Sequence, residues 1–189
     1  MTDALVKFFS SPRAWRAWLL RNHKKPDGVW LRFFKKGTGK KSMVYGEALD
    51  EALCFGWIDG QSKSEGALSW KQRFTPRRAK SLWSKTNREH VARLIAEKKM
   101  TSAGLKEIES AKKDGRWDRA YDSPKNMEVP ADFLQELRKD KKAYAFFKTL
   151  NKANSYAIVW RLQTAKKEET RARRKKALLD MLSNGKRLH

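Results

Sequence analysis

The spacing of apolar residues changes between helical and alternating along the first 80 positions of the chain. Trp15, Trp18 and Leu19 share one helical face, and Ser11-Pro12 ahead of them supplies a capping side chain and a proline for the first helical position. By contrast, the segment 68–75 alternates apolar and polar side chains, as a half-buried strand does. The pattern predicts five elements in this order: helix 12–23, strand 29–34, helix 47–55, a very short strand or turn at 57–60, and strand 68–75.

From Pro76 onward the periodic segments have helical spacing. The predicted helices are one around 91–95, one that Thr101 opens and Gly115 ends, and four more over 131–138, 141–150, 156–164 and 168–182. The stretch 117–130 holds two prolines and predicts an irregular connection. We therefore expect an α+β fold, in which a small, mainly antiparallel sheet with flanking helices precedes an all-helical C-terminal region. The expected domains are 1–116 and 117–189, with the second packed on or beside the first.

The net charge of the chain indicates an anionic partner. The chain has 44 Lys and Arg against 21 Asp and Glu, which gives a formal net charge of +23. Such a charge creates a positive field that attracts nucleic acid, anionic lipid and phosphorylated metabolites. Its plain alternative is a contribution to solubility. Eight tryptophans and 40% hydrophobic residues supply a core, so the fold needs no metal or disulfide to stabilise it.

Cysteine and histidine usage exclude several kinds of site. Cys54 is the single cysteine, and it follows Leu53 in an apolar helical stretch, which predicts a buried thiol. Its isolation favours a reducing compartment, and with no signal peptide in Met1–Phe9 and no 18-residue apolar run, we expect a cytoplasmic protein without a membrane span. The three histidines are scattered, so we expect no metal.

Catalytic and nucleotide-binding motifs give no positive signal. The sequence contains no Gly-x-Ser-x-Gly nucleophile elbow and no Gly-x-Gly-x-x-Gly segment, and the Gly37–Lys41 run lacks the spacing of a phosphate-binding loop. We therefore expect no cofactor, and a binding role is favoured over an enzymatic one. An enzyme with a site around Asp59 and Arg77 is the third interpretation.

Two neighbouring segments carry opposite charge. Four acids and no base lie between Val44 and Ser62, whereas eight bases and one acid lie between Lys63 and Arg88. We expect Asp59 to pair with Arg73, Arg77 or Arg78 in one shared pocket, because the planar guanidinium binds a carboxylate or phosphate bidentately. The alternative is an acidic helix face that is merely solvated.

The strand-to-helix transition at 73–84 is the best candidate for an anion site. Arginines, hydroxyls and an indole gather there, and backbone N–H groups at a helix start can hold an anion. The alternative is a capped turn anchored by an internal salt bridge. The candidate ligand-binding residues are Trp57, Asp59, Arg73, Thr75, Arg77, Arg78, Ser81, Trp83 and Asn87.

A second basic cluster lies near the end of the chain. Five bases in one predicted helix could grip phosphates, with the salt-sensitive affinity that such contacts have. The leucines of the same helix favour the simpler interpretation, a solvated face of an amphipathic helix. The candidate residues are Arg171, Arg173, Arg174, Lys175 and Lys176.

Several blocks of the sequence resemble the YdeI/OmpD-associated family. The blocks are Tyr45–Gly60, Arg73–Arg78 with Ser81, Trp83, Ser84 and Asn87, then Met100 with Ala103–Leu105, Asp114–Trp117 with Ala120-Tyr121, and finally Ala165-Lys166 and Glu169–Arg171. Members of that family are labelled bacteriocin-protection proteins and are linked to resistance to cationic antimicrobial peptides and to an outer-membrane porin. The resemblance carries no catalytic residues over to this chain.

The resemblance and the charge together leave two leading interpretations of function. The first is a non-enzymatic accessory protein of bacteriocin or stress resistance that acts by binding. The second is a nucleic-acid-binding protein that uses its basic surface. A chain of charge +23 would repel a cationic peptide, so direct capture of the peptide would require the acidic segment 44–62.

Overall fold

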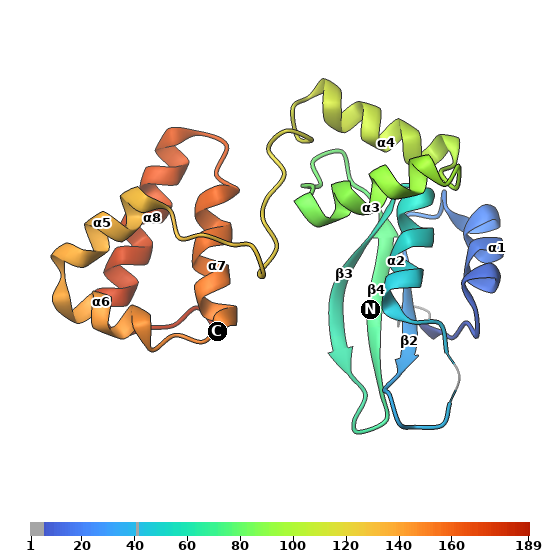
Figure 1. Ribbon diagram of the computed structural model, residues 1–189, viewed down its shortest axis with the longest axis horizontal. Coiled ribbons are helices and arrows are strands. Elements are labelled where there is room, and N and C mark those ends of the chain that lie inside the picture. The colour runs from blue at the N-terminus through green and yellow to red at the C-terminus, as the bar shows by residue number, and fades with distance from the viewer. Residues whose placement is uncertain (1–5, 41) are drawn as a thin grey trace. The chain divides into compact units, whose positions relative to one another are not determined.

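The chain folds into two compact units. The structure, a computed structural model, describes residues 6–40 and 42–189. The N-terminal unit extends to Trp83 and includes Asn87–Asp118, and the C-terminal unit consists of Ser84–Thr86 and Arg119–His189. Figure 1 shows a sheet with helices in the first unit and only helices, coloured orange to red, in the second.

A four-stranded mixed sheet forms the centre of the N-terminal unit, in the order β1-β2-β4-β3. The strands are β1 Val6–Lys7, β2 Val29–Phe34, β3 Trp57–Ser64 and β4 Ser69–Pro76. β4 pairs antiparallel with both β2 and β3, and β1 pairs parallel with β2. The expected α+β class with a small, mainly antiparallel sheet is confirmed. The expected short element at 57–60 is only the start of β3, which continues through polar residues because it pairs with β4 across a hairpin.

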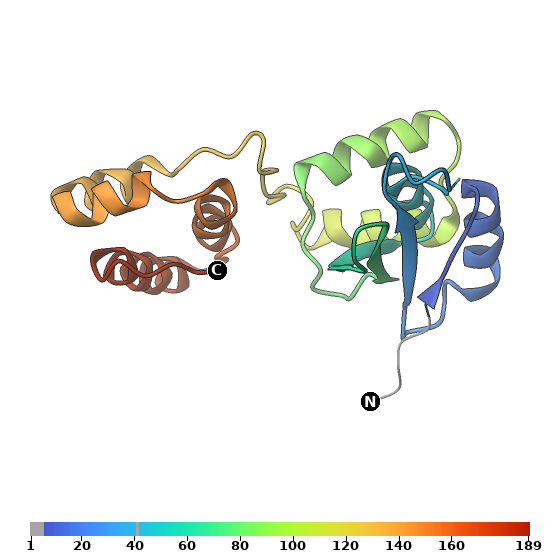
Figure 2. The same ribbon diagram turned by 90° about the horizontal axis from the view of Figure 1, so that it is seen from below.

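Helices α1 (Pro12–Asn22) and α2 (Tyr45–Cys54) pack on one face of the sheet, and α2 lies over this face in both ribbon views (Figures 1 and 2). Ser11 caps α1 as predicted, because its hydroxyl accepts a hydrogen bond from the backbone of Ala14 at 3.3 Å. Trp15 is fully buried, with its ring 5.9 Å from that of Phe74 on β4. Its indole N–H donates to the carbonyl of Ala48, which fixes α1 against α2.

Helices α3 (Lys85–Ala96) and α4 (Ser102–Lys113) complete this part of the chain. The start of α4 is joined to the end of α2, since Thr101 Oγ1 donates to the carbonyl of Cys54 at 2.6 Å. Gly104 makes the approach possible, because a Cβ atom at this position would overlap the Cys54 carbonyl and Met100. Close contact between α2 and α4 therefore depends on a residue without a side chain.

Four helices make up most of the C-terminal unit: α5 Ala131–Lys139, α6 Lys141–Lys148, α7 Lys152–Gln163 and α8 Glu168–Ser183. Their buried core consists of Phe133, Leu137, Ala143, Ile158, Leu162, Leu178 and Leu182. α7 begins four residues earlier than the helix predicted over 156–164, because Asn151 caps it by accepting from the backbone of Asn154. Within the described residues, no helix has the length and apolar character needed to cross a membrane.

Candidate functional site

The carboxylate of Asp59 lies between the sheet and α2. It accepts hydrogen bonds from Tyr45 Oη at 2.8 Å and from Gln72 Nε2 at 3.4 Å. Asp59 is directly opposite Phe74, so the neighbouring Arg73 projects from the other face of the sheet, where its Nη2 donates to the carbonyl of Asp27. The structure thus does not bring Asp59 and Arg73 together, because alternation along β4 places them on opposite faces.

Arg77 contacts the segment that follows β4. Its guanidinium stacks on the ring of Trp83, with 3.6 Å between Cζ and the ring centroid, and its Nη1 donates to the carbonyl of Leu82. Its backbone N–H donates to the carbonyl of Gly56, which joins the segment to the turn before β3. Arg77 is 7% exposed and Trp83 is 1% exposed, so both are packed inside the unit.

A second buried arginine supports the same segment. Arg116 is 3% exposed, and its guanidinium donates to the carboxylate of Asp114, the carbonyl of Ser81 and the hydroxyl of Ser110. The Ser81 hydroxyl accepts from the backbone N–H of Arg78. These contacts cap the turn at Arg78–Ser81 and anchor it to the start of the segment after α4.

The other candidate residues of this group are dispersed. Trp57 is buried in the core, where its indole N–H donates to the carbonyl of His23 at 2.7 Å. Thr75 lies opposite Ile58 on the sheet face turned away from α2, and Asn87 lies in the first turn of α3. Arg78 is exposed. The anion site expected at 73–84 stays a prediction, as does the pairing of Asp59 with Arg77 or Arg78.

The acidic segment is largely paired within the fold. Asp50 accepts from Arg93 at 2.6 Å and from His90 at 2.7 Å, and Glu51 accepts from Arg16 at 2.7 Å. These acids therefore tie α2 to α1 and α3. Cys54 on the same helix is fully buried as predicted, and burial raises the pKa of its thiol to about 11.

The basic cluster on α8 is also partly neutralised. Arg171 forms a bidentate pair with Asp132, and Lys175 approaches the same carboxylate at 3.1 Å. The two cations hold the pKa of Asp132 well below its usual range, chiefly through the hydrogen bonds from Arg171. Arg174 donates to the carbonyl of Arg161. Arg173 and Lys176 are exposed.

The sheet face turned away from α2 carries a concentrated set of cations. Arg32 on β2, Lys71 and Arg73 on β4 and Lys63 on β3 project from it around Trp30. We call Trp30, Arg32, Lys63, Lys71 and Arg73 the basic face. The ammonium groups of Lys63 and Lys71 lie 5.3 and 5.5 Å from the Trp30 ring centroid, within the range of a cation–π interaction. Four cations from three strands thus share one surface.

A register irregularity places Lys63 on this face. Asp59 pairs with Phe74 and Ser62 pairs with Gln72, so β3 has one residue more than β4 over this stretch. Such a bulge shifts the alternation by one residue. Lys63 therefore lies opposite Lys71, although a regular ladder would have directed it toward α2.

An acidic residue and two aromatic rings lie next to the basic face. Glu65 in the hairpin accepts from Arg32 at 2.7 Å and lies 3.6 Å from Lys71, so Arg32 lowers the pKa of the Glu65 carboxyl. Beyond β1, Phe8 is 46% exposed and contacts Phe34 edge to face, with 5.5 Å between ring centroids. Cations and accessible aromatic rings therefore occur side by side, as they do in proteins that bind single-stranded nucleic acid.

Comparison with known families divides the chain. Residues 7–107, more than half of the chain, match the family described as domain of unknown function DUF8412. The chain belongs to this family. Residues 126–185 match the family described as bacteriocin-protection, YdeI or OmpD-associated. No curated protein and no solved structure matches the chain significantly.

The expected YdeI/OmpD-associated resemblance is confirmed for the C-terminal unit. The match includes all of α5 to α8 and contains the blocks Ala165-Lys166 and Glu169–Arg171. The blocks Tyr45–Gly60 and Arg73–Arg78, which suggested the same family, lie within the DUF8412 match instead. The basic face also lies within the DUF8412 match.

Sequence reasoning missed the basic face, although one signal was present. The polar positions of the alternating segment 68–75 include Lys71 and Arg73, which already indicated a cationic strand face. The contributions of Trp30, Arg32 and Lys63 depend on which strands pair and in which register. Those pairings come from the tertiary structure.

Proposed function

We propose that the protein is a non-enzymatic binding protein whose basic face takes single-stranded nucleic acid. The observation that carries the proposal is the convergence of Arg32, Lys63, Lys71 and Arg73 around Trp30 on one sheet surface. Phosphate contacts by such cations supply most of the affinity of sequence-independent binding. The net charge of +23 adds attraction at long range.

The sheet geometry favours a single strand over a duplex. A strand of nucleic acid can follow a sheet face and stack its bases on accessible rings, here Phe8 and Phe34. The major groove of a duplex admits a helix or a two-stranded ribbon more readily than a four-stranded face. Lys40 lies 4.8 Å from the Phe34 ring and extends the cationic character toward this margin.

The family description bacteriocin protection supplies the biological setting of the proposal. Direct capture of a cationic peptide has little support, because Asp50 and Glu51 are engaged in internal ion pairs. We propose that protection follows from binding to nucleic acid inside the cell, a polyanion that the charge of the protein suits.

A charge-reversal experiment tests the molecular activity. Anisotropy of a fluorescein-labelled 20-mer of deoxythymidine should show saturable binding that weakens with salt. The Lys63→Glu, Lys71→Glu double variant should bind roughly tenfold or more weakly at 0.15 M salt, and loss of two phosphate contacts should flatten the slope of log K against log[salt] by about 1.4. The matched control reverses Lys106 and Lys113, two exposed residues of α4.

The control separates a local site from a general field, because both double variants change the net charge equally. If the two variants weaken binding to the same extent, the basic face is not the site. The proposal also fails if the wild-type protein binds phosphatidylserine vesicles but no oligonucleotide. If the Lys63, Lys71 variant then loses vesicle binding, the basic face is a membrane-binding surface instead. In a bacteriocin-sensitive host, the same variant should fail to restore protection that the control variant restores.

A further inference from the structure

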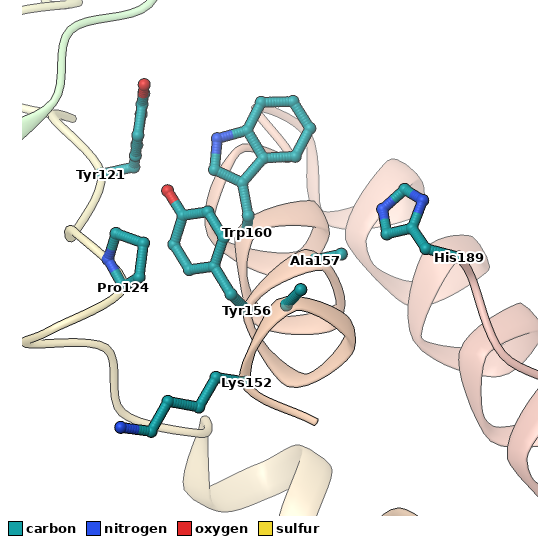
Figure 3. A pocket seen from close by; sticks show the side chains of 8 residues that line it. Tyr121, Pro124, Lys152, Tyr156, Ala157, Trp160 and His189 are labelled. Carbon is teal, nitrogen blue, oxygen red and sulfur yellow. The ribbon is translucent and has the colours of Figure 1, made fainter. Parts of the chain in front are cut away.

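The C-terminal unit contains an aromatic cavity, and none of the residues of the basic face lines it. It has a volume of about 700 Å³, and its lining includes Tyr121, Pro124, Lys152, Tyr156, Trp160 and His189. Figure 3 shows the rings of Tyr121, Tyr156 and Trp160 gathered around one space, with Lys152 at its margin. A cavity of this size lined mostly by apolar groups is typical of a small-molecule site.

The spacing of residues along α7 creates one wall. Lys152, Tyr156 and Trp160 recur every four residues and therefore share one face of the helix, opposite the face that carries Ile158 and Leu162 into the core. The small side chains of Ala153 and Ala157 leave room between the larger ones. This second stripe is visible in the sequence, but periodicity alone attributes it to ordinary packing.

Hydrogen bonds of Asp122 hold the opposite wall of the cavity, the segment 121–124, against α7. Asp122 receives a hydrogen bond from Gln163 Nε2 at 3.0 Å, and its backbone N–H donates to Gln163 Oε1. Lys85 forms an ion pair with the same carboxylate at 2.7 Å. Tyr156 Oη donates to the carbonyl of Asp122. The segment carrying Tyr121 and Pro124 is therefore held in position, which lowers the cost of binding.

The polar groups of the cavity favour an anion. None of the lining side chains is acidic, whereas Lys152 brings a full positive charge to the margin. The carboxylate of Asp122 is compensated by Lys85. Burial raises the pKa of Tyr156 to about 12, so its phenol stays neutral at physiological pH. A ligand must therefore place an apolar or aromatic body against the rings and an acidic group near Lys152.

We propose that this cavity binds a small amphipathic organic anion, with an aromatic or apolar body between Tyr121, Tyr156 and Trp160 and an acidic group at Lys152. Trp160 is 36% exposed, so a bound ring would shield it from water. The site lies in the unit that matches the bacteriocin-protection family, and it is independent of the nucleic-acid proposal.

Two fluorescent probes of similar size test the proposal on the full-length protein. The aromatic sulfonate 1-anilinonaphthalene-8-sulfonate should bind with one-to-one stoichiometry, and neutral N-phenyl-1-naphthylamine should bind more weakly. Lys152→Met should weaken the sulfonate about threefold to tenfold, as loss of a partly exposed ion pair does, and leave the neutral probe unchanged. Ala153→Leu fills the cavity on an exposed helix position and should weaken both probes.

The matched control is Lys141→Met, which removes an exposed charge from α6 and should affect neither probe. Circular dichroism establishes that each variant is folded. If Ala153→Leu leaves both probes bound as before, the cavity is not the site. If Lys141→Met weakens the sulfonate as much as Lys152→Met does, the probe responds to net charge, and the anion-selective site is refuted.

Discussion

Gly104→Ala tests how closely α4 approaches α2. A Cβ atom at this position would overlap the backbone carbonyl of Cys54, which belongs to α2 and cannot rotate away. The methyl group therefore forces the start of α4 to move. That movement would also lengthen the hydrogen bond from Thr101 Oγ1 to the same carbonyl, now 2.6 Å.

Three contributions decide the sign of the effect. Alanine is favoured over glycine in a helix by up to about 1 kcal/mol. Forcing an extra methyl group into a packed contact costs roughly 1–3 kcal/mol, and loss of a hydrogen bond costs about another 1 kcal/mol. The net result for Gly104→Ala is a destabilisation of about 1–3 kcal/mol. With a urea m-value of about 2 kcal/mol/M, the unfolding midpoint should fall by roughly 0.5–1.5 M.

Tryptophan fluorescence during urea unfolding measures this change in the correct unit. All tryptophans except Trp160 lie in the N-terminal unit, so the signal reports mainly on the region that contains Gly104. The matched control is Gly46→Ala in α2, where a Cβ atom meets nothing within 4 Å. That substitution should raise stability by about 0.4–1 kcal/mol, because it restricts the unfolded chain.

The two substitutions are chemically identical and should have opposite signs. If Gly104→Ala is neutral or stabilising while Gly46→Ala stabilises, the close approach of α4 to Cys54 is wrong. If both destabilise to a similar extent, the effect belongs to glycine in helices generally, and the argument from the carbonyl contact fails.

Burial raises the pKa of the Cys54 thiol to about 11. A disulfide reagent at pH 8 should therefore label the native protein at least about 100-fold more slowly than the urea-unfolded protein. Equal labelling rates would contradict the burial of the thiol. Arg171, and to a smaller extent Lys175, lower the pKa of the Asp132 carboxyl in the folded state, so their stabilisation is present above the unfolded pKa of about 4 and is lost as pH falls through the folded value. Asp132→Asn should therefore lower the free energy of unfolding by at most about 1 kcal/mol at pH 7, because the Asp132 side chain is 45% exposed. Thermal unfolding should show that this loss of stability shrinks below pH 4. A loss that does not depend on pH would refute the ion pair.

Local sequence patterns determined most of the secondary structure. The cap at Ser11, the alternation over 68–75 and the helical stripes after residue 130 correspond to α1, β4 and the C-terminal helices. These features depend on residues a few positions apart, so the chain specifies them without knowledge of its long-range contacts. The buried state of Cys54 followed in the same way, from its apolar helical neighbours.

Tertiary structure decided where charged side chains meet. Asp59 and Arg73 are on neighbouring strands, yet the register of β3 with β4 places them on opposite faces. The bulge between Asp59 and Ser62 then brings Lys63 across from Lys71, over Trp30 of a third strand. A shift of one residue reverses every side chain of a strand, and register is set by pairing between distant segments. The sequence therefore revealed the cations, and only the folded sheet determined which of them form one surface.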